Sequence, residues 1–156
     1  MAALHLTRDS TAPPTVLWDV VTDFAAYQRW MPVTTMRLDP GTRRPGWGFA
    51  ARSGVGPVGF TDPMLLTAWE PPSDGRAGHF RVVKTGALLG GWVDARVEPR
   101  GGGSRLVWDQ DLVVRPLPLK SLTAPVLTAA GELLYGRALD AIVAEADRAA
   151  ARGTGR

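Results

Sequence analysis

Residues 12–32, APPTVLWDVVTDFAAYQRWMP, constrain the fold of this chain more than any other stretch. Pro13 and Pro14 suit a first helical turn, where the amide donors that proline lacks have no helical partner in any case. The apolar residues that follow recur at the spacing of one helix face: Leu17, Val20, Val21 and Phe24. Asp23 can cap a second helix, and Pro32 limits that helix to about two turns because the residue before a proline disfavours the helical conformation. Two short helices are therefore predicted, packed against one end of a sheet.

Most of the chain outside this segment has the pattern of β-strands. Short runs with alternating apolar residues are separated by glycine and proline turns, as an antiparallel meander requires. The predicted strands are 3–8, 34–38, 47–53, 58–69, 79–85, 92–98 and 105–114. The expected class is therefore α+β, with seven antiparallel strands and the two short helices between the first and second of them.

One long helix is predicted at the C-terminus, from residue 121 to about residue 152. Pro125 fits its first turn. A broad apolar face recurs along it: Leu127, Ala130, Leu134, Ala138, Ala141 and Ile142. A helix this long and this apolar on one side has to lie across the sheet. Gly131 costs helix stability, which indicates either a ligand that approaches closely there or tight packing against a strand.

The last two strands indicate which side of the sheet faces inward. One face of the final strand carries the larger inward set: Leu106, Trp108, Gln110, Leu112 and Val114. Asp109 and Asp111 are on the other face and are expected to mark the solvent side. The preceding strand places small residues inward: Val93, Ala95 and Val97. Such residues either leave room for a cavity or interdigitate with large ones, and both outcomes remain open.

Length and composition fit one domain, expected over residues 1–152, with a disordered tail at 153–156. No stretch of about 18 uncharged apolar residues is present, and residues 1–10 lack the apolar core of a signal peptide. We therefore expect a cytoplasmic protein without integral membrane association. The absence of cysteine excludes disulfides, thiolate nucleophiles and cysteine metal sites.

The positive charge does not indicate a nucleic-acid partner. The net charge is +3 at pH 7 and the pI is about 9.9, but the arginines are scattered and no run is longer than Arg43-Arg44. A nucleic-acid surface would instead show a basic stripe or cluster with interleaved aromatic residues. Monomer and homodimer both remain open.

The predicted order of elements is a strand, two short helices, six strands and a closing helix. Three sequence patterns accompany it. These are VLWDVVTDFAAYQRWMP near the start, AWEPP at 68–72 and GGGSRLVW at 101–108. The chain resembles the helix-grip domains of the START and polyketide cyclase/dehydrase superfamily, also called SRPBCC, and most of all its small bacterial cyclase-like or dehydrase-like group. The resemblance implies a deep, mostly apolar cavity between a curved sheet and the long helix, used for lipids, polyketides, sterols, hormones or aromatic intermediates.

A nucleophile with a base is the first catalytic arrangement to seek, and His5 and His79 are the available imidazoles. His5 is expected to face away from the core on the first strand, and His79 follows a turn, so both are interpreted as surface or edge residues. Two isolated histidines make a metal site improbable. GVGPVG at 54–59 precedes a strand and not a helix, so it is no phosphate loop. No metal and no cofactor is expected.

Two charged residues on the predicted strands are the candidates for catalysis. Asp62 lies among Phe60, Met64 and Leu66, where a desolvated carboxylate suits general acid or base work. Pro63 indicates a bulge or a strand edge, so an outward position for Asp62 is equally possible. Lys84 is on a strand whose Phe80 and Val82 are expected to face inward, and it can orient an anionic or carbonyl group or lie at the surface.

Ligand contacts are predicted from residues with aromatic or polar side chains on inward faces, together with the helix glycine. Aromatic rings can stack on a flat ligand, although aromatic cores are commoner. Gln110 and Tyr135 can supply hydrogen bonds. The full set of predicted ligand-binding residues is Trp47, Phe60, Trp69, Trp108, Gln110, Gly131 and Tyr135.

Two functions follow from this reading. The first is binding of a hydrophobic small molecule, which needs no catalytic residue. The alternative is a polyketide cyclase or dehydratase that folds its substrate while Asp62 or Lys84 moves a proton. Convergence of Asp62, Lys84 and Gln110 on one enclosed volume would favour the enzyme, and a purely apolar lining would favour binding. A filled interior would favour neither and would leave a structural role.

Overall fold

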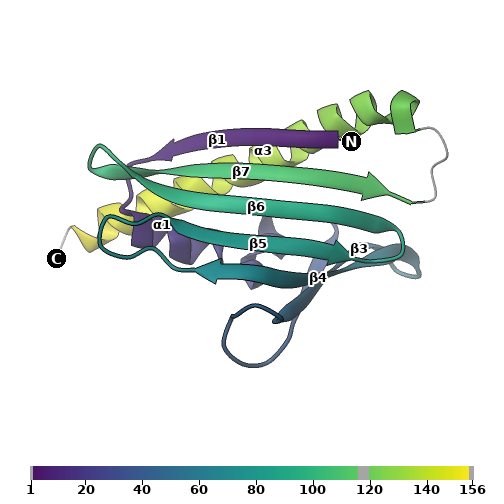
Figure 1. Cartoon of the computed structure of the whole chain (residues 1–156), viewed down its shortest axis with the longest axis horizontal. Helices are drawn as coiled ribbons and strands as arrows, with labels where there is room; N and C mark the ends of the chain where they lie inside the picture. The colour runs from purple at the N-terminus through teal and green to yellow at the C-terminus, as the bar shows by residue number, and fades with distance from the viewer. Residues whose placement is uncertain (1, 116–119, 155–156) are drawn as a thin grey trace.

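The computed structural model, which describes residues 2–115 and 120–154, shows one antiparallel sheet and a long C-terminal helix (Figure 1). The elements in chain order are β1 (Ala2–Ser10), α1 (Pro14–Val21), η1 (Phe24–Ala26), α2 (Tyr27–Trp30), β2 (Thr34–Leu38), β3 (Gly48–Val55), β4 (Val58–Glu70), β5 (Gly78–Thr85), β6 (Leu89–Arg100), β7 (Gly103–Val114) and α3 (Lys120–Gly153). The predicted fold class is confirmed, because the seven strands, the early short helices and the closing helix follow the helix-grip arrangement.

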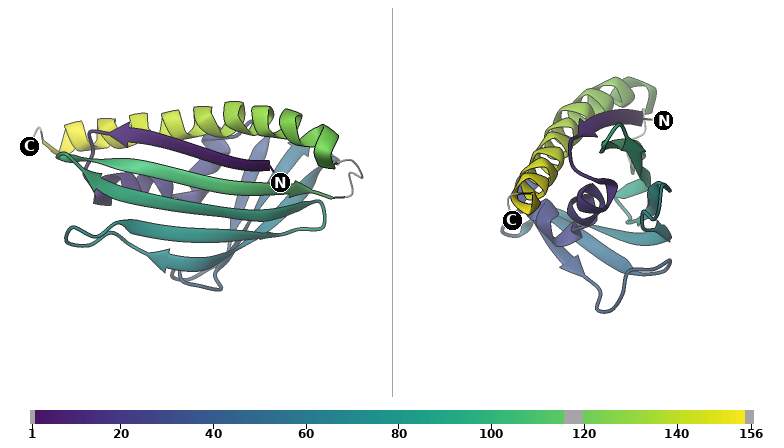
Figure 2. Two further views of the ribbon diagram at one scale, coloured as in Figure 1. Left: turned by 45° about the horizontal axis from the view of Figure 1, so that its top comes forward. Right: turned by 90° about the vertical axis from the view of Figure 1, so that its left-hand side faces the viewer.

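The sheet has the strand order β1-β7-β6-β5-β4-β3-β2, and every neighbouring pair is antiparallel. The first strand therefore pairs with the last, while β2 forms the opposite edge. Figure 2 shows the sheet curving around α1, with α3 lying along the side that the sheet leaves open. The curvature places inward-facing side chains of distant strands around a common interior.

The segment from α1 to α2 forms the short helices that were predicted to pack against one end of the sheet. Pro14 is the first residue of α1, and Leu17, Trp18 and Val21 on its inner side are buried. The second helix is split into the 3₁₀ turn η1 and the short α2. Asp23 stands at the N-cap position of η1, but its side chain makes no capping hydrogen bond, so the predicted cap is wrong.

Side chains from α1, α3 and the sheet fill the interior around α1. The largest fully buried side chains include Leu17, Phe80, Leu106, Leu139 and Ile142. The Trp18 ring packs against Trp69, with ring centroids 5.0 Å apart, and edge-on against Phe80. Gly78 lies directly below this indole, since a Cβ there would come within 2.6 Å of Trp18 Cε3.

Two expectations about polar or helix-breaking residues are wrong. Asp111, expected on the solvent side of β7, is only 7% exposed, and its Oδ1 has no hydrogen-bond partner among the described residues. It stands opposite Trp92 in the β6–β7 register, beside a side chain large enough to shield it. Pro125 lies inside α3 and not in its first turn, because the helix begins at Lys120.

The C-terminal part of α3 continues further than predicted. Gly153 is its last residue, and the Thr154 amide donates to the Ala150 carbonyl at 3.2 Å. Residues 155 and 156 of the predicted disordered tail lie outside the described residues. The side chain of Leu127, predicted on the apolar face of the helix, also lies outside them. Ala138 and Ile142 of that face are buried.

Candidate ligand cavity

A cavity of about 270 Å³ lies between the sheet and the N-terminal half of α3. The six strands β2 to β7 contribute to its wall, together with η1, α2 and α3. Most lining side chains are apolar, and α3 adds Ala130, Gly131, Leu134 and Tyr135. The interior of the fold is therefore hollow at this end, where Ala130 and Gly131 of α3 contribute little side-chain volume.

Alternation along β4 and β5 brings two charged side chains into this wall. Phe60, Asp62 and Met64 of β4 line the cavity, as do Phe80, Val82 and Lys84 of β5. Each strand projects every second residue inward. For Asp62 and Lys84 the sequence left inward and outward placement open, and the structure shows the inward one.

Pro63 leaves the alternation of β4 intact. The β3–β4 register runs without a shift past Pro63, which faces Ala50, and the bulge of β4 lies between Leu66 and Ala68. Pairing with β5 begins only at Met64, so the missing amide of Pro63 falls where β4 has no paired residue on that side. Pro63 was expected to mark either a bulge or a strand edge. The structure shows the edge, because β4 is not paired with β5 at this residue.

Asp62 and Lys84 form a buried ion pair in the cavity wall. The Lys84 ammonium donates to Asp62 Oδ2. The Lys84 side chain is 5% exposed and the Asp62 side chain is 6% exposed. Lys84 Nζ also lies 3.7 Å from Met64 Sδ, a weak acceptor. Asp62 Oδ1 is buried and has no hydrogen-bond partner among the described residues. The pair thus brings compensated charges and an acceptor without a partner in the described residues to a mostly apolar cavity.

Aromatic rings form the part of the cavity next to the filled core. Trp108 lines it beside Tyr135, with ring centroids 6.1 Å apart. The Trp108 indole donates to Gln110 Oε1 at 3.0 Å, and this contact engages the oxygen of the buried Gln110 amide. Tyr27 also lines the cavity and donates to the Val21 carbonyl at 2.8 Å. Burial raises the pKa of the Tyr27 phenol, so it stays a neutral donor.

The structure divides the predicted ligand-binding residues into two groups. Residues in the cavity wall are Phe60, Trp108, Gly131 and Tyr135, with the candidate pair Asp62 and Lys84. Trp47, Trp69 and Gln110 lie outside the lining. Trp47 stacks on Phe24 and donates its indole N–H to the Asp39 carbonyl at 3.1 Å, while Trp69 packs on Trp18. These three side chains face other protein groups, which strand alternation cannot distinguish from a cavity.

Several lining residues were not predicted from the sequence. They come mainly from β2, β3 and the start of β6: Met31, Thr34, Met36, Ala51, Ser53 and Leu89. In β3, Ala51 and Ser53 share a strand face with the buried Phe49, so alternation alone could have identified them as inward-facing. Their strands become a wall only because the sheet curves, and periodicity does not report curvature.

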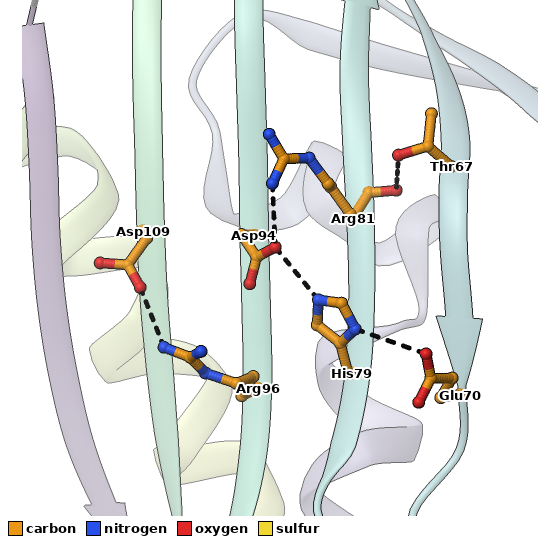
Figure 3. A network of polar contacts seen from close by, with 7 residues as sticks. All are labelled: Thr67, Glu70, His79, Arg81, Asp94, Arg96 and Asp109. Carbon is orange, nitrogen blue, oxygen red and sulfur yellow. Dashed lines mark hydrogen bonds and ion pairs between the residues drawn. The ribbon is translucent and has the colours of Figure 1, made fainter.

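Both histidines lie on the other face of the sheet. Figure 3 shows His79 between Asp94 and Glu70, with Nε2 3.1 Å from Asp94 Oδ2. Arg81 contacts the same Asp94 oxygen at 3.4 Å, and His5 pairs with Asp109 at the β1–β7 junction. These contacts agree with the surface or edge placement predicted for the histidines. Both imidazoles lie outside the cavity wall.

Two kinds of feature are absent from residues 2–115 and 120–154, the residues that the structure describes. Within these ranges no three His, Asp or Glu side chains are grouped to hold a metal ion. No helix in the same part of the chain is long and apolar enough to span a bilayer.

Comparison with protein families gives one match over nearly the whole chain. Residues 1–147 match the family described as polyketide cyclase / dehydrase and lipid transport. No curated protein shows significant similarity to the chain.

Solved structures share the fold at low sequence identity. The Zhui aromatase/cyclase from Streptomyces sp. R1128 is 19% identical with a TM-score of 0.70, covering 94% of this chain and 93% of its own. TTHA0849 from Thermus thermophilus is 11% identical with a TM-score of 0.73, at 94% and 98% coverage. CV1439 from Chromobacterium violaceum is 15% identical with a TM-score of 0.62, at 94% and 97% coverage. At these identities the likeness shows the fold alone.

Proposed function

Because the chain belongs to the polyketide cyclase / dehydrase and lipid transport family, we propose that it binds a hydrophobic small molecule between the sheet and α3. The observation that carries the proposal is the cavity of about 270 Å³, lined mostly by apolar side chains. Ligand sites are typically concave, mostly apolar and equipped with a few placed polar groups. Here the Asp62–Lys84 pair supplies those groups.

The size of the cavity favours a compact ligand. A dry cavity of roughly 150 Å³ in another protein binds benzene, so about 270 Å³ suits a molecule of about two fused rings or an aliphatic chain of similar volume. The rings of Trp108, Phe80 and Phe24 in the wall favour a flat ligand, because offset and edge-on aromatic contacts add to the burial of apolar area.

Binding is tested with a pair of matched variants on β3. Ala51→Phe adds a ring to the cavity wall, whereas Ala50→Phe adds the same ring to the neighbouring residue on the other face of the sheet. We expect Ala51→Phe to weaken binding of naphthalene, a neutral two-ring probe whose fluorescence reports its binding, by about tenfold or more, and Ala50→Phe to leave it unchanged. Native mass spectrometry, with extraction of copurifying compounds, identifies the ligand class. Equal probe binding by both variants would contradict the proposal.

The buried ion pair favours a second candidate function, a polyketide cyclase or dehydratase. In that function the cavity holds the substrate in a folded conformation, the Asp62 carboxylate accepts a proton from a carbon next to a ketone, and Lys84 donates a hydrogen bond to the ketone oxygen. The family and the shared fold of the Zhui aromatase/cyclase support it.

Proton exchange tests this second function without knowledge of the natural substrate. In D₂O, we expect the wild-type protein to accelerate deuterium exchange at the methyl group of 2-acetonaphthone, followed by NMR. Asp62→Asn removes the base and should abolish the acceleration, while Ala50→Phe should retain it. Exchange at the buffer rate with the wild-type protein would count against the cyclase and leave the binding function unaffected.

A further inference from the structure

We propose that the cavity selects neutral molecules carrying a hydroxyl group, and rejects carboxylates, because the hydroxyl donates to Asp62 Oδ1. This inference rests on the proposed binding function and deepens it. The sequence alone left Lys84 free to orient an anionic group. The structure instead places a carboxylate of the protein itself against that lysine.

The charges of the wall leave no counterion for a charged ligand. In the part of the wall that the structure describes, Asp62 and Lys84 carry the formal charges at pH 7, and they neutralise each other. A carboxylate ligand would lose its hydration on entering an apolar cavity and would find a lysine that is already paired. A protonated amine would meet the same obstacle with the opposite sign. The cavity therefore favours an uncharged molecule.

The unused hydrogen-bonding capacity of the pair specifies the polar group. Asp62 Oδ1 is a buried acceptor without a partner among the described residues, which is unfavourable until a donor reaches it. A lysine ammonium has three donors, and those of Lys84 contact Asp62 Oδ2 and the weak acceptor Met64 Sδ. One donor therefore stays available for an oxygen. A hydroxyl group donates and accepts at once, so a single hydroxyl can satisfy both residues.

Three ligands of the same ring system separate these effects. They are 2-naphthol, naphthalene and 2-naphthoate, measured by isothermal titration calorimetry at pH 7. We expect 2-naphthol to bind about tenfold or more tightly than naphthalene, because a hydrogen bond to a charged group is stronger than one between neutral groups. We expect 2-naphthoate to bind more weakly than 2-naphthol by at least a similar factor.

Two double variants make the assignment specific. Asp62→Leu with Lys84→Met replaces the pair by apolar side chains of similar size, a change that buried ion pairs commonly tolerate. It should abolish the preference for 2-naphthol over naphthalene. Arg96→Met with Asp109→Leu removes an ion pair on the outer face of the sheet, where the two side chains are 3.3 Å apart, and should leave the preference intact.

The outcomes distinguish this inference from the function on which it rests. Tighter binding of 2-naphthoate than of 2-naphthol overturns the inference, as does a preference for 2-naphthol that survives in the Asp62→Leu, Lys84→Met variant. Equal binding of naphthalene and 2-naphthol also overturns it, while supporting the proposed binding function. If none of the three compounds binds the wild-type protein, both proposals fail together.

Discussion

The two ends of the space beneath α3 are built from the same elements but are filled differently. Around α1, Leu139 and Ile142 of α3 join Leu17 and Val21 in a core with almost no exposed area. Around Gly131 of the same helix, a cavity of about 270 Å³ remains. One helix thus serves as part of a packed core over its C-terminal half and as a cavity wall over its N-terminal half.

This difference indicates that one end of the fold supplies stability and the other end carries the candidate functional groups. The packed end holds the sheet, α1 and α3 together through apolar burial, which is the dominant favourable contribution to folding. The hollow end contains a buried ion pair, a carboxylate oxygen without a partner in the described part of the chain, and Gly131 inside α3. Unsatisfied buried groups of this kind tend to mark function and not stability.

The largest effect should come from breaking the ion pair at the hollow end. Lys84→Met leaves the Asp62 carboxylate buried without its partner, and we expect a loss of about 3–5 kcal/mol in the free energy of unfolding. Adding Asp62→Leu should recover most of that loss. Urea denaturation at pH 7 measures both. A double variant as unstable as the single one would show that the pair contributes packing more than charge compensation.

A smaller effect compares the two ends directly through the same substitution in α3. Leu139→Ala removes a side chain that is 1% exposed and should cost about 3 kcal/mol. Leu134→Ala enlarges a cavity that already exists and should cost about 1 kcal/mol, because less contact is lost. Thermal and urea denaturation of the two variants give the comparison. Similar losses at both positions would mean that the cavity end is as tightly packed as the core.

A gain of stability is expected from Gly131→Ala. Alanine favours a helix over glycine by about 1 kcal/mol. A Cβ at this position would meet only Leu4 Cδ2, at 4.0 Å, which is ordinary contact. The variant should therefore melt at a higher temperature, and calorimetric titration with 2-naphthol should show weaker binding if the glycine makes room for the ligand. Unchanged binding would assign the glycine to helix packing against β1.

The smallest effect concerns acid sensitivity at the packed end. Asp147 of α3 loses hydration on burial, but hydrogen bonds from the Ser10 hydroxyl at 2.6 Å and the Thr11 amide at 3.0 Å outweigh this and lower its pKa below the ordinary 3.8. The stability it contributes is present above pH 3.8 and is lost as the pH falls through the lowered pKa. Because solvent still reaches the group and screens it, the contribution is below about 1 kcal/mol.

Asp147→Asn isolates this contribution. Urea denaturation between about pH 2 and pH 7 should show the wild type more stable than Asp147→Asn at neutral pH, with the difference shrinking below about pH 4. A difference that stays constant over this range would place the effect in the hydrogen bonds alone and not in the charge.

The sequence predicted the elements well because local patterns determine them. The strand expected at 34–38 has the bounds that the structure shows. Alternation left inward and outward positions open for Asp62 and Lys84, and the structure places both inward. Their pairing could not be predicted, because it depends on the β4–β5 register, which aligns Met64 with Lys84. Periodicity gives the face of a strand but not its alignment with another strand.

The same limit explains the residues that were misplaced. Trp47 and Trp69 are on inward faces, but other aromatic rings cover them, and such contacts depend on tertiary packing. Asp111 was assigned to solvent by alternation and is buried beside Trp92, its partner in register. Side chains on other elements decide these outcomes, those of η1 and α1 for the two tryptophans and that of β6 for Asp111, and no single strand carries that information.

The pairing of β1 with β7 has a consequence for the order in which the molecule forms. Leu4 aligns with Gln110, so the first strand has to wait until most of the chain has been synthesised before it can dock. Loop closure over such a distance is slow, and folds dominated by distant contacts fold slowly. On the ribosome, β7 and α3 are made after β2 to β6. The part of the cavity wall that β7 and α3 contribute can therefore form only after those strands have been synthesised.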